Sequence, residues 1–301
     1  MSDLDSGMEK FRSGYVSLVG RPNVGKSTLL NTILGEKIAI VTPKPQTTRN
    51  RINGIKTLPH AQIIFIDTPG IHKPRQRLGE AMNRSAFEAL EEVDIVLFMV
   101  EPEAPRSGDL FVIERIKLVD KPVFLLINKL DTVRKNEILP VIEAYSKLYP
   151  FKEIIPLSAL KTNGIDVLLE TVLKYIPEGP KLYPDDIVTD QMERFMAEEI
   201  IREKIMEATQ EEVPYSSAVE IEQWQVRDDG VIFIQANIYI ERDGQKGIII
   251  GNKGSRLKSI GTKARHDIEG LLGTRVFLEL WVKIKKDWRS DERTLRELGF
   301  R

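Results

Sequence analysis

The chain has 301 residues, of which 42% are hydrophobic and none is cysteine. This length suffices for about two folded domains, and the missing cysteines exclude disulfide bonds and thiolate metal sites. No hydrophobic run approaches the roughly 20 residues of a membrane-spanning helix. The first ten residues lack the hydrophobic core of a signal peptide, so we predict a cytoplasmic protein with a flexible lead over residues 1–13.

The net charge of −1 hides a strong asymmetry along the chain. Residues 1–181 hold 25 basic and 22 acidic residues, residues 182–241 hold 4 and 15, and residues 242–301 hold 15 and 8. The net charges are therefore +3, −11 and +7, which sum to −1. A basic segment in a near-neutral chain indicates a footprint for a polyanion, although a merely solvated basic surface is common.

Residues 14–178 are predicted to form an α/β domain with a doubly wound, mostly parallel sheet. Short, nearly continuous hydrophobic runs alternate with helical stretches, as expected for strands covered on both faces of the sheet. Residues 35–50 show little periodicity and contain two prolines, so we expect a mobile loop there. The predicted strands are residues 15–19, 51–55, 63–66, 95–100, 123–127 and 154–157.

A phosphate-binding loop of the form G-x-x-x-x-G-K-[ST] follows the first strand and precedes a helix. Its glycines let backbone N–H groups close around a phosphate, and the helix N-terminus adds partial positive charge. Lys26 is expected to reach the β- and γ-phosphates, and the Ser27 hydroxyl to bind Mg²⁺. The predicted loop comprises Gly20, Arg21, Pro22, Asn23, Val24, Gly25, Lys26, Ser27 and Thr28.

Three further motifs each follow a predicted strand. Asp67 can hold Mg²⁺ through water, and Gly70 can offer its N–H to a γ-phosphate. Asp131 is predicted to read the base, because a carboxylate accepts from the two neighbouring N–H donors that guanine has and adenine lacks. A backbone N–H of the third motif is expected near the guanine O6. The motifs are Asp67-Thr68-Pro69-Gly70, Asn128-Lys129-Leu130-Asp131 and Ser158-Ala159-Leu160.

A second domain is predicted over residues 189–301, after a linker at residues 179–188. Its first helix is expected to begin with a capping pair of Asp190 and Glu193. The periodicity then predicts strands and helices in the order of a type II KH domain, α-β-β-α-α-β, with a basic, helical tail from residue 288. The predicted strands are 217–226, 231–241 and 275–285, and the later helices are 243–250 and 255–272.

The centre of this second domain contains a GXXG loop, with which KH domains clamp about four nucleotides. Its glycines let a sugar-phosphate backbone approach, and Lys253 is placed for a phosphate. We expect Ile249 and Ile250 to line an apolar groove for bases, and Trp281 and Trp288 to pack rather than stack on bases. The predicted RNA-binding residues are Ile249, Ile250, Gly251, Asn252, Lys253, Gly254 and Arg256.

The motifs GRPNVGKS, DTPG, NKLD and SAL resemble those of translation-factor-related GTPases, and nearly the whole chain resembles the Era family of bacterial ribosome-assembly GTPases. The resemblance implies hydrolysis of GTP to GDP, and a first switch at residues 46–50 whose threonine binds Mg²⁺. We favour Thr48 over Thr47, but spacing alone does not decide. It also implies binding of single-stranded 16S rRNA near its 3′ end, assistance to 30S subunit assembly, and peripheral association with the inner membrane.

The chain departs from the Ras-like pattern at Ile71, where a glutamine would orient the attacking water. We predict that Ile71 is not catalytic, so that intrinsic hydrolysis is slow or uses another group. We give His72 little weight as that group. The resemblance implies that Asn23 coordinates K⁺ in place of an arginine finger; alternatively, Asn23 only tolerates the loop geometry. The predicted catalytic set is Lys26, Thr48, Asp67 and Gly70.

Two other functions are alternatives to a GTP-driven switch that binds rRNA. One is an RNA-modifying enzyme with a regulatory GTPase, which would need a second catalytic constellation that the sequence does not display. The other is a membrane-associated signalling GTPase, for which only the basic tail offers support, through weak attraction to anionic lipid.

Overall fold

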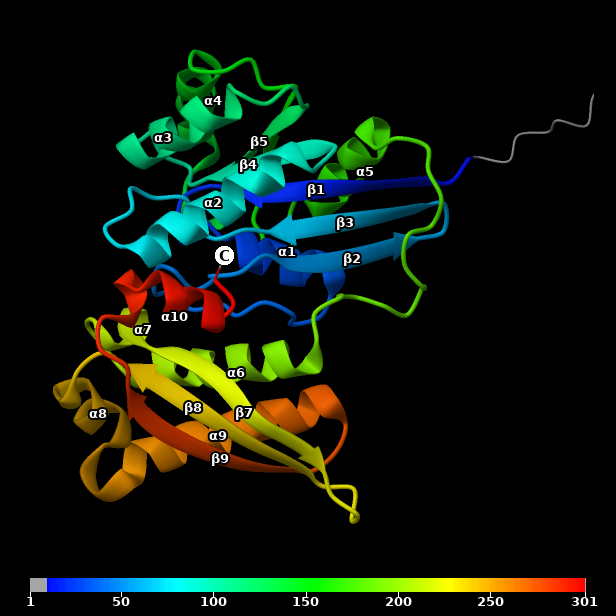
Figure 1. Ribbon diagram of the computed structural model, residues 1–301. Helices are drawn as coiled ribbons and strands as arrows, with labels where there is room; N and C mark the ends of the chain where they lie inside the picture. Colours follow the sequence, from blue (N-terminus) through cyan, green and yellow to red (C-terminus); the bar gives the residue numbers. More distant parts are fainter. Residues whose placement is uncertain (1–9, 301) are drawn as a thin grey trace, which may run out of the picture. The chain divides into compact units, whose positions relative to one another are not determined.

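The computed structural model describes residues 10–300, which form two compact units (Figure 1). The first unit contains residues up to 39 together with 48–73 and 83–190, and the second contains residues 40–47, 74–82 and those from 191 onward.

The first unit is a six-stranded sheet with the strand order β2-β3-β1-β4-β5-β6. Only β2 runs antiparallel to its neighbour, β3; all other pairs are parallel. Every residue of β3, β4 and β5 is buried, which explains their continuous hydrophobic sequences. The predicted α/β class is confirmed. The elements are β1 (Arg12–Val19), α1 (Lys26–Leu34), β2 (Ile52–Leu58), β3 (Ala61–Asp67), α2 (Arg77–Glu91), β4 (Ile95–Val100), α3 (Ser107–Ile116), β5 (Val123–Ile127), α4 (Ile138–Ser146), β6 (Glu153–Pro156) and α5 (Ile165–Tyr175).

The parallel register brings the sequence motifs to one edge of this sheet. Leu18, just before the phosphate loop, pairs with Asp67 at the end of β3. Asn128 directly follows β5, and its N–H donates to the carbonyl of Val100 at the end of β4 (2.9 Å). Ligands of open α/β sheets bind outside the carboxyl ends of the strands, where these motifs lie.

The second unit is built around a three-stranded sheet of order β7-β8-β9, in which β8 is antiparallel to β7 and parallel to β9. Alternate residues of β8, from Ile232 to Ile240, are buried in one core with residues of α6 and α9. The predicted order of helices and strands is confirmed, with one additional short helix, α7, before the first strand. The elements are α6 (Glu193–Ala208), α7 (Val213–Ser216), β7 (Ala218–Val226), β8 (Ile232–Ile240), α8 (Asp243–Ile250), α9 (Ser255–Leu272), β9 (Val276–Ile284) and α10 (Glu292–Glu297).

Three local predictions need correction. The flexible lead cannot extend to residue 13, because β1 begins at Arg12; residues 1–9 of that lead lie outside the described part of the chain. Asp190 does not cap α6, because the N-cap of that helix is Met192. The Asp190 carboxylate instead accepts a hydrogen bond from Asn53 Nδ2 (2.8 Å). In the described part of the tail, residues 288–300, only Glu292–Glu297 forms an α-helix, preceded by a 3₁₀ turn.

The two tryptophans considered for stacking differ in their environments. Trp288 is completely buried and donates from Nε1 to the Ser216 carbonyl (2.9 Å), so the prediction that it packs is confirmed. Trp281 is 55% exposed on β9, so the same prediction is wrong for this side chain.

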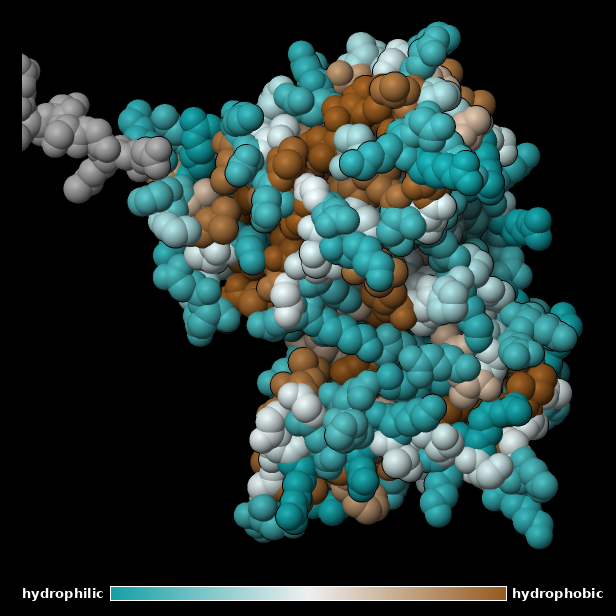
Figure 2. Space-filling model, turned by 180° about the vertical axis from the view of Figure 1, so that it is seen from behind, coloured by the Kyte–Doolittle hydropathy of each residue, from teal (hydrophilic) through white to brown (hydrophobic). Residues whose placement is uncertain are grey.

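The surface seen in Figure 2 carries more hydrophobic patches on the first unit than on the second, whose visible face is mostly hydrophilic. Among residues 10–300, no helix has both the length and the hydrophobicity that crossing a bilayer requires.

Candidate functional site

The phosphate loop connects β1 to α1 and holds its lysine inward. Lys26 Nζ donates to the carbonyls of Gly20 (3.3 Å) and Arg21 (3.1 Å), so the ammonium group lies within the loop. Burial lowers the pKa of Lys26 to about 8, and the nearby carboxylate of Asp67 acts in the opposite direction. The loop therefore keeps a cation at the start of α1, where the helix N-terminus also favours negative ligands.

Three oxygen-bearing side chains from separate segments meet beside this loop. Ser27 Oγ donates to Asp67 Oδ2 (2.6 Å), Thr48 Oγ1 donates to the same oxygen (3.1 Å), and the two hydroxyls lie 2.8 Å apart. The hydroxyl of Thr47 is engaged elsewhere, with the Lys44 carbonyl (2.7 Å) and Thr42 Oγ1 (3.1 Å). Thr48, rather than Thr47, thus faces the other two oxygens.

The Asp67 carboxylate fits a divalent cation. It is completely buried, and its Oδ1 atom has no hydrogen-bond partner among the described residues. Burial raises its pKa, against the effects of Lys26 and the two hydroxyls. Mg²⁺ is typically held by one or two carboxylates together with hydroxyls and the phosphates of a ligand. A cation with nucleotide phosphates would thus satisfy an oxygen that the described residues leave unpaired. Within those residues, no cluster of three or more His, Asp or Glu side chains offers a different metal site.

The turn after β3 is docked on the phosphate loop. The Ile71 N–H donates to the Gly20 carbonyl (3.1 Å), and the Ile71 side chain is completely buried in the core. At Gly70, a Cβ atom would lie 2.7 Å from the Pro22 backbone, so a side chain has no space. The His72 ring nitrogen Nδ1 lies 2.9 Å from the Gly70 carbonyl of its own loop.

Asn128 ties the base motif to the other two loops. Its Nδ2 atom donates to the Val24 carbonyl (2.8 Å), and its Oδ1 atom accepts from the Ala159 N–H (2.9 Å). The Asp131 carboxylate accepts from the Ser158 hydroxyl. The structure therefore brings the phosphate loop, the NKLD motif and the SAL motif together, as predicted for one nucleotide site.

The same contacts narrow the choice of backbone donor in the SAL motif. Ser158 N–H donates to the Asn163 carbonyl (3.0 Å) and Ala159 N–H to Asn128, so these two amides are engaged. Within residues 10–300, the Leu160 amide is the remaining backbone donor of this motif for a ligand. Its side chain is 70% exposed. The hydroxyl of Thr68, in contrast, donates to the Leu18 carbonyl (2.6 Å) and stabilises the fold rather than a ligand.

The sequence interpretation missed three carboxylates that surround Arg21 of the phosphate loop. Arg21 Nε donates to Asp109 (2.8 Å), and its Nη2 atom lies 2.9 Å from Glu103 and 3.5 Å from Glu101. The only signal for them is that Glu101 directly follows β4, at the edge of the sheet that carries the other motifs.

The GXXG loop of the second unit joins α8 to α9. Asn252, Lys253 and Arg256 are exposed, and the N-terminal turn of α9 follows directly. Lys253 and Gly254 both have positive φ angles, 49° and 80°, which turn the backbone sharply between the helices. The loop thus presents two cations and a helix N-terminus to solvent, an arrangement that attracts phosphate.

One predicted RNA-binding side chain is misplaced. Ile249 is completely buried in the core of the second unit, so the prediction that it lines a base groove is wrong. Ile250 is half-buried and packs against the same core, whereas Ile248 is 39% exposed. In three consecutive isoleucines on a helix, only one can point directly into the core.

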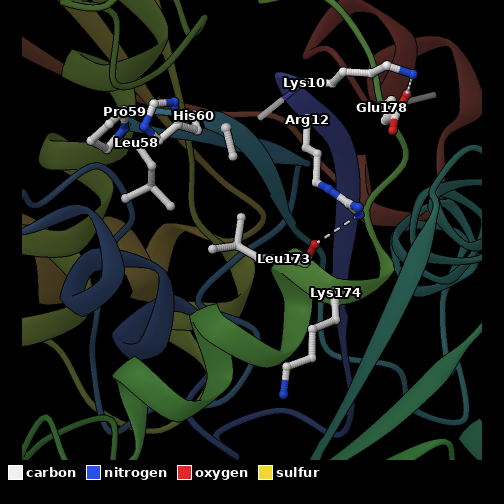
Figure 3. Close-up of a pocket in the computed structure, with 9 residues that line it drawn as sticks. Lys10, Arg12, Leu58, Pro59, His60, Leu173, Lys174 and Glu178 are labelled. Carbon is white, nitrogen blue, oxygen red and sulfur yellow. Dashed lines mark hydrogen bonds and ion pairs between the residues drawn. The ribbon is translucent and has the colours of Figure 1, made fainter. Parts of the chain in front are cut away.

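A pocket of about 560 Å³ lies in the first unit, at the amino-terminal edge of β1 and β3 (Figure 3). Arg12 on its wall donates to the Leu173 carbonyl in the last turn of α5 (3.4 Å) and to the Ile176 carbonyl just after that helix (2.9 Å). The pocket contains none of the predicted site residues and lies at the edge of the sheet opposite the phosphate loop.

Comparisons with known proteins agree with this geometry. Residues 15–129 match a family of 50S ribosome-binding GTPases, and residues 212–289 match the KH domain family. The chain is 52% identical to GTPase Era of Ruminiclostridium cellulolyticum, over 97% of this chain and 98% of the relative. It is 56% identical to GTPase Era of Geobacter metallireducens, over 96% and 98%.

Two solved structures are similar over almost their whole length. One is a crystal structure of Era in complex with MgGDPNP and nucleotides 1506–1542 of 16S ribosomal RNA, with 46% identity, a TM-score of 0.94 and coverage of 96% of this chain and 99% of the other. The second is a single-residue variant of Aquifex aeolicus Era bound to GDP·AlF₄⁻, with 46% identity, a TM-score of 0.93 and the same coverage. The chain therefore belongs to the Era family of GTPases.

Proposed function

We propose that this GTPase is a nucleotide-driven switch that binds single-stranded 16S rRNA near its 3′ end and assists assembly of the 30S subunit. The observation that carries the proposal is the presence, in one chain, of the convergent Ser27, Thr48 and Asp67 oxygens and of an exposed, cationic GXXG loop. The relative whose structure contains 16S rRNA nucleotides supports the choice of RNA.

In the nucleotide site, Ser27 and Thr48 would hold Mg²⁺ directly, and Asp67 would hold it through water. When bound, Mg²⁺ neutralises charge on the β- and γ-phosphates. Lys26 supplies a second positive charge inside the loop, and the Gly70 N–H is a donor for the γ-phosphate. Loss of that phosphate would remove the ligand that keeps Thr48 and Gly70 in place, which is the basis of a switch.

Base recognition would rest on Asp131, with the Leu160 amide as the donor to the guanine O6. A carboxylate that accepts from both guanine N–H groups excludes adenine, which cannot donate at both positions. The bond from the Ser158 hydroxyl orients this carboxylate before the base arrives.

Hydrolysis would proceed without a water-orienting side chain in the position of the Ras-like glutamine, because the Ile71 side chain there is apolar and buried. Asn23 is exposed in the phosphate loop with a φ of 66°, and we propose that it coordinates K⁺ beside the phosphates. A cation there would stabilise the charge that develops during phosphoryl transfer.

For RNA, the GXXG loop is the proposed clamp, with Lys253 and Arg256 as phosphate contacts and Ile250 beside the bases. Peripheral contact with the inner membrane is a finer proposal that rests only on the basic charge of residues 242–301. Co-sedimentation with anionic vesicles would test it, and failure to sediment at physiological salt would remove it.

The proposal as a whole is tested by RNA binding in different nucleotide states. A labelled oligonucleotide with the 3′-terminal 16S rRNA sequence should bind more tightly to protein loaded with a non-hydrolysable GTP analogue than with GDP. A scrambled oligonucleotide of equal length is the control. Equal affinity for both sequences would contradict the RNA target, whereas equal affinity in both nucleotide states would contradict the switch.

A further inference from the structure

Glu101 contacts both halves of the candidate nucleotide site. It directly follows β4, and one of its carboxylate oxygens accepts from Lys129 Nζ of the NKLD motif. The other lies 3.5 Å from Arg21 Nη2 in the phosphate loop. A single carboxylate therefore lies between two cations that belong to different motifs.

Arg21 is itself firmly anchored, so it can serve as a fixed point. Its Nε atom donates to Asp109 on α3 (2.8 Å), and Asp109 is completely buried. The other oxygen of Asp109 accepts from the Arg106 N–H (2.9 Å), which holds the carboxylate in place. Because Glu101 contacts this fixed arginine of the phosphate loop, a shift of Lys129 relative to Glu101 would shift the base motif relative to the phosphate loop.

We propose that Glu101 is a positioning residue, which sets the distance between the phosphate loop and the guanine-reading motif through Arg21 and Lys129. The proposal rests on the assignment of residues 128–131 as the base site. Asn128 already links the two motifs through an uncharged hydrogen bond to Val24. Glu101 adds a charged link, because its two carboxylate oxygens are shared between Lys129 and Arg21.

The exposure of these side chains sets the size of the effect. The side chains of Arg21, Glu101 and Lys129 are 15%, 27% and 35% exposed, so solvent screens their attraction only in part. Ion pairs of this kind lie between surface pairs and buried ones, which suggests about a fivefold change in nucleotide affinity when the carboxylate is neutralised.

The chain offers a matched control in Glu103. Its carboxylate lies 2.9 Å from Arg21, closer than that of Glu101, and its described ion pairs are with Arg21 and Arg106. Glu103→Gln therefore removes one negative charge beside Arg21 but leaves the link to Lys129 intact. Glu101→Gln removes the same charge and also reduces the ion pair with Lys129 to, at most, a hydrogen bond to a neutral amide.

The experiment measures dissociation of a fluorescent GDP by stopped flow and binding of inorganic pyrophosphate by competition. We expect Glu101→Gln to release GDP about fivefold faster than wild type, with Glu103→Gln within about twofold. Pyrophosphate contacts only the phosphate loop, so its affinity should be the same in both variants. Equal GDP release by the two variants would overturn the proposal. So would a loss of pyrophosphate affinity in Glu101→Gln that is as large as its loss of GDP affinity.

A double substitution tests whether Glu101 acts through Lys129. In a Lys129→Met protein, adding Glu101→Gln should cause no further acceleration; a persisting effect of about fivefold would mean that Glu101 acts through Arg21 alone. Melting temperatures of the nucleotide-free variants report on folding. Wild-type protein that binds ADP as well as GDP would instead remove the base-site assignment itself, so the two failures are distinguishable.

Discussion

A single charge added to the GXXG loop should separate RNA contact from folding. At Gly254 a Cβ atom would meet nothing within 4 Å, so a new side chain points into open space. The φ of 80° costs about 1 kcal/mol for a residue with a side chain, and Asn and Asp tolerate this conformation similarly. Gly254→Asn and Gly254→Asp therefore share the same shape and strain, and they differ by one negative charge.

The magnitude follows from the distance at which a phosphate would approach. At about 5 Å, two unit charges interact by about 1 kcal/mol in water and about 3 kcal/mol at the effective dielectric of a protein surface. Gly254→Asp should thus bind single-stranded RNA roughly 5- to 150-fold more weakly than Gly254→Asn. Gly251 is less suitable, because a Cβ there would lie 2.7 Å from Arg256 Cβ and would disturb the loop itself.

The assay is fluorescence anisotropy of a labelled single-stranded RNA at two salt concentrations, with GDP affinity and the melting temperature measured in parallel. GDP affinity should be unchanged, because the predicted nucleotide residues all belong to the first unit. If the Asp and Asn variants bind RNA equally while both remain folded, no phosphate approaches this loop and the RNA assignment fails.

Three further predictions concern other parts of the chain. Asp131→Asn should shift preference from GTP towards xanthosine triphosphate, because an amide can donate to the xanthine carbonyl; a competition assay that shows undiminished preference for GTP would exclude Asp131 as the base reader. K⁺ should raise the GTPase rate relative to Na⁺ at matched ionic strength and saturating Mg²⁺, and Asn23→Ala should remove this difference; equal wild-type rates in the two salts would contradict the K⁺ site. Burial raises the pKa of Glu198 to about 7 from its ordinary 4.5, despite the opposing bond from the Ile221 N–H. Since the folded state holds this proton more tightly, the free energy of unfolding should fall as the pH rises from about 5 to about 8, and Glu198→Gln should reduce that fall. An equal fall in melting temperature for wild type and Glu198→Gln over this range would contradict the role of Glu198.

The sheet of the first unit could be predicted from sequence because its strands are buried on both faces. The run Val123–Ile127, for example, is hydrophobic throughout, and it is followed directly by the Asn128-Lys129-Leu130-Asp131 motif, whose chemistry is recognisable from the sequence. In the second unit, the strand Ile232–Ile240 could be predicted from a different local pattern, in which alternate residues are apolar and face the core. Both patterns are local, so they need no knowledge of distant residues.

The remaining features depend on contacts between distant residues or on side-chain direction. Thr47 and Thr48 are equivalent in spacing, and only the fold shows which hydroxyl faces Asp67. The link through Glu101 joins residues 21, 101 and 129, which no short motif connects. Ile249 lies in a run of three isoleucines, where hydrophobicity alone does not indicate which side chain enters the core.

The most direct test of the account is crosslinking of the protein to RNA in living cells, followed by sequencing of the bound RNA. Wild-type protein should recover 16S rRNA with crosslinks concentrated near its 3′ end, and Gly254→Asp should lose that enrichment while Gly254→Asn retains most of it. Crosslinks spread evenly over cellular RNA, or an enrichment that Gly254→Asp leaves intact, would contradict the claim that this GTPase recognises rRNA through its GXXG loop.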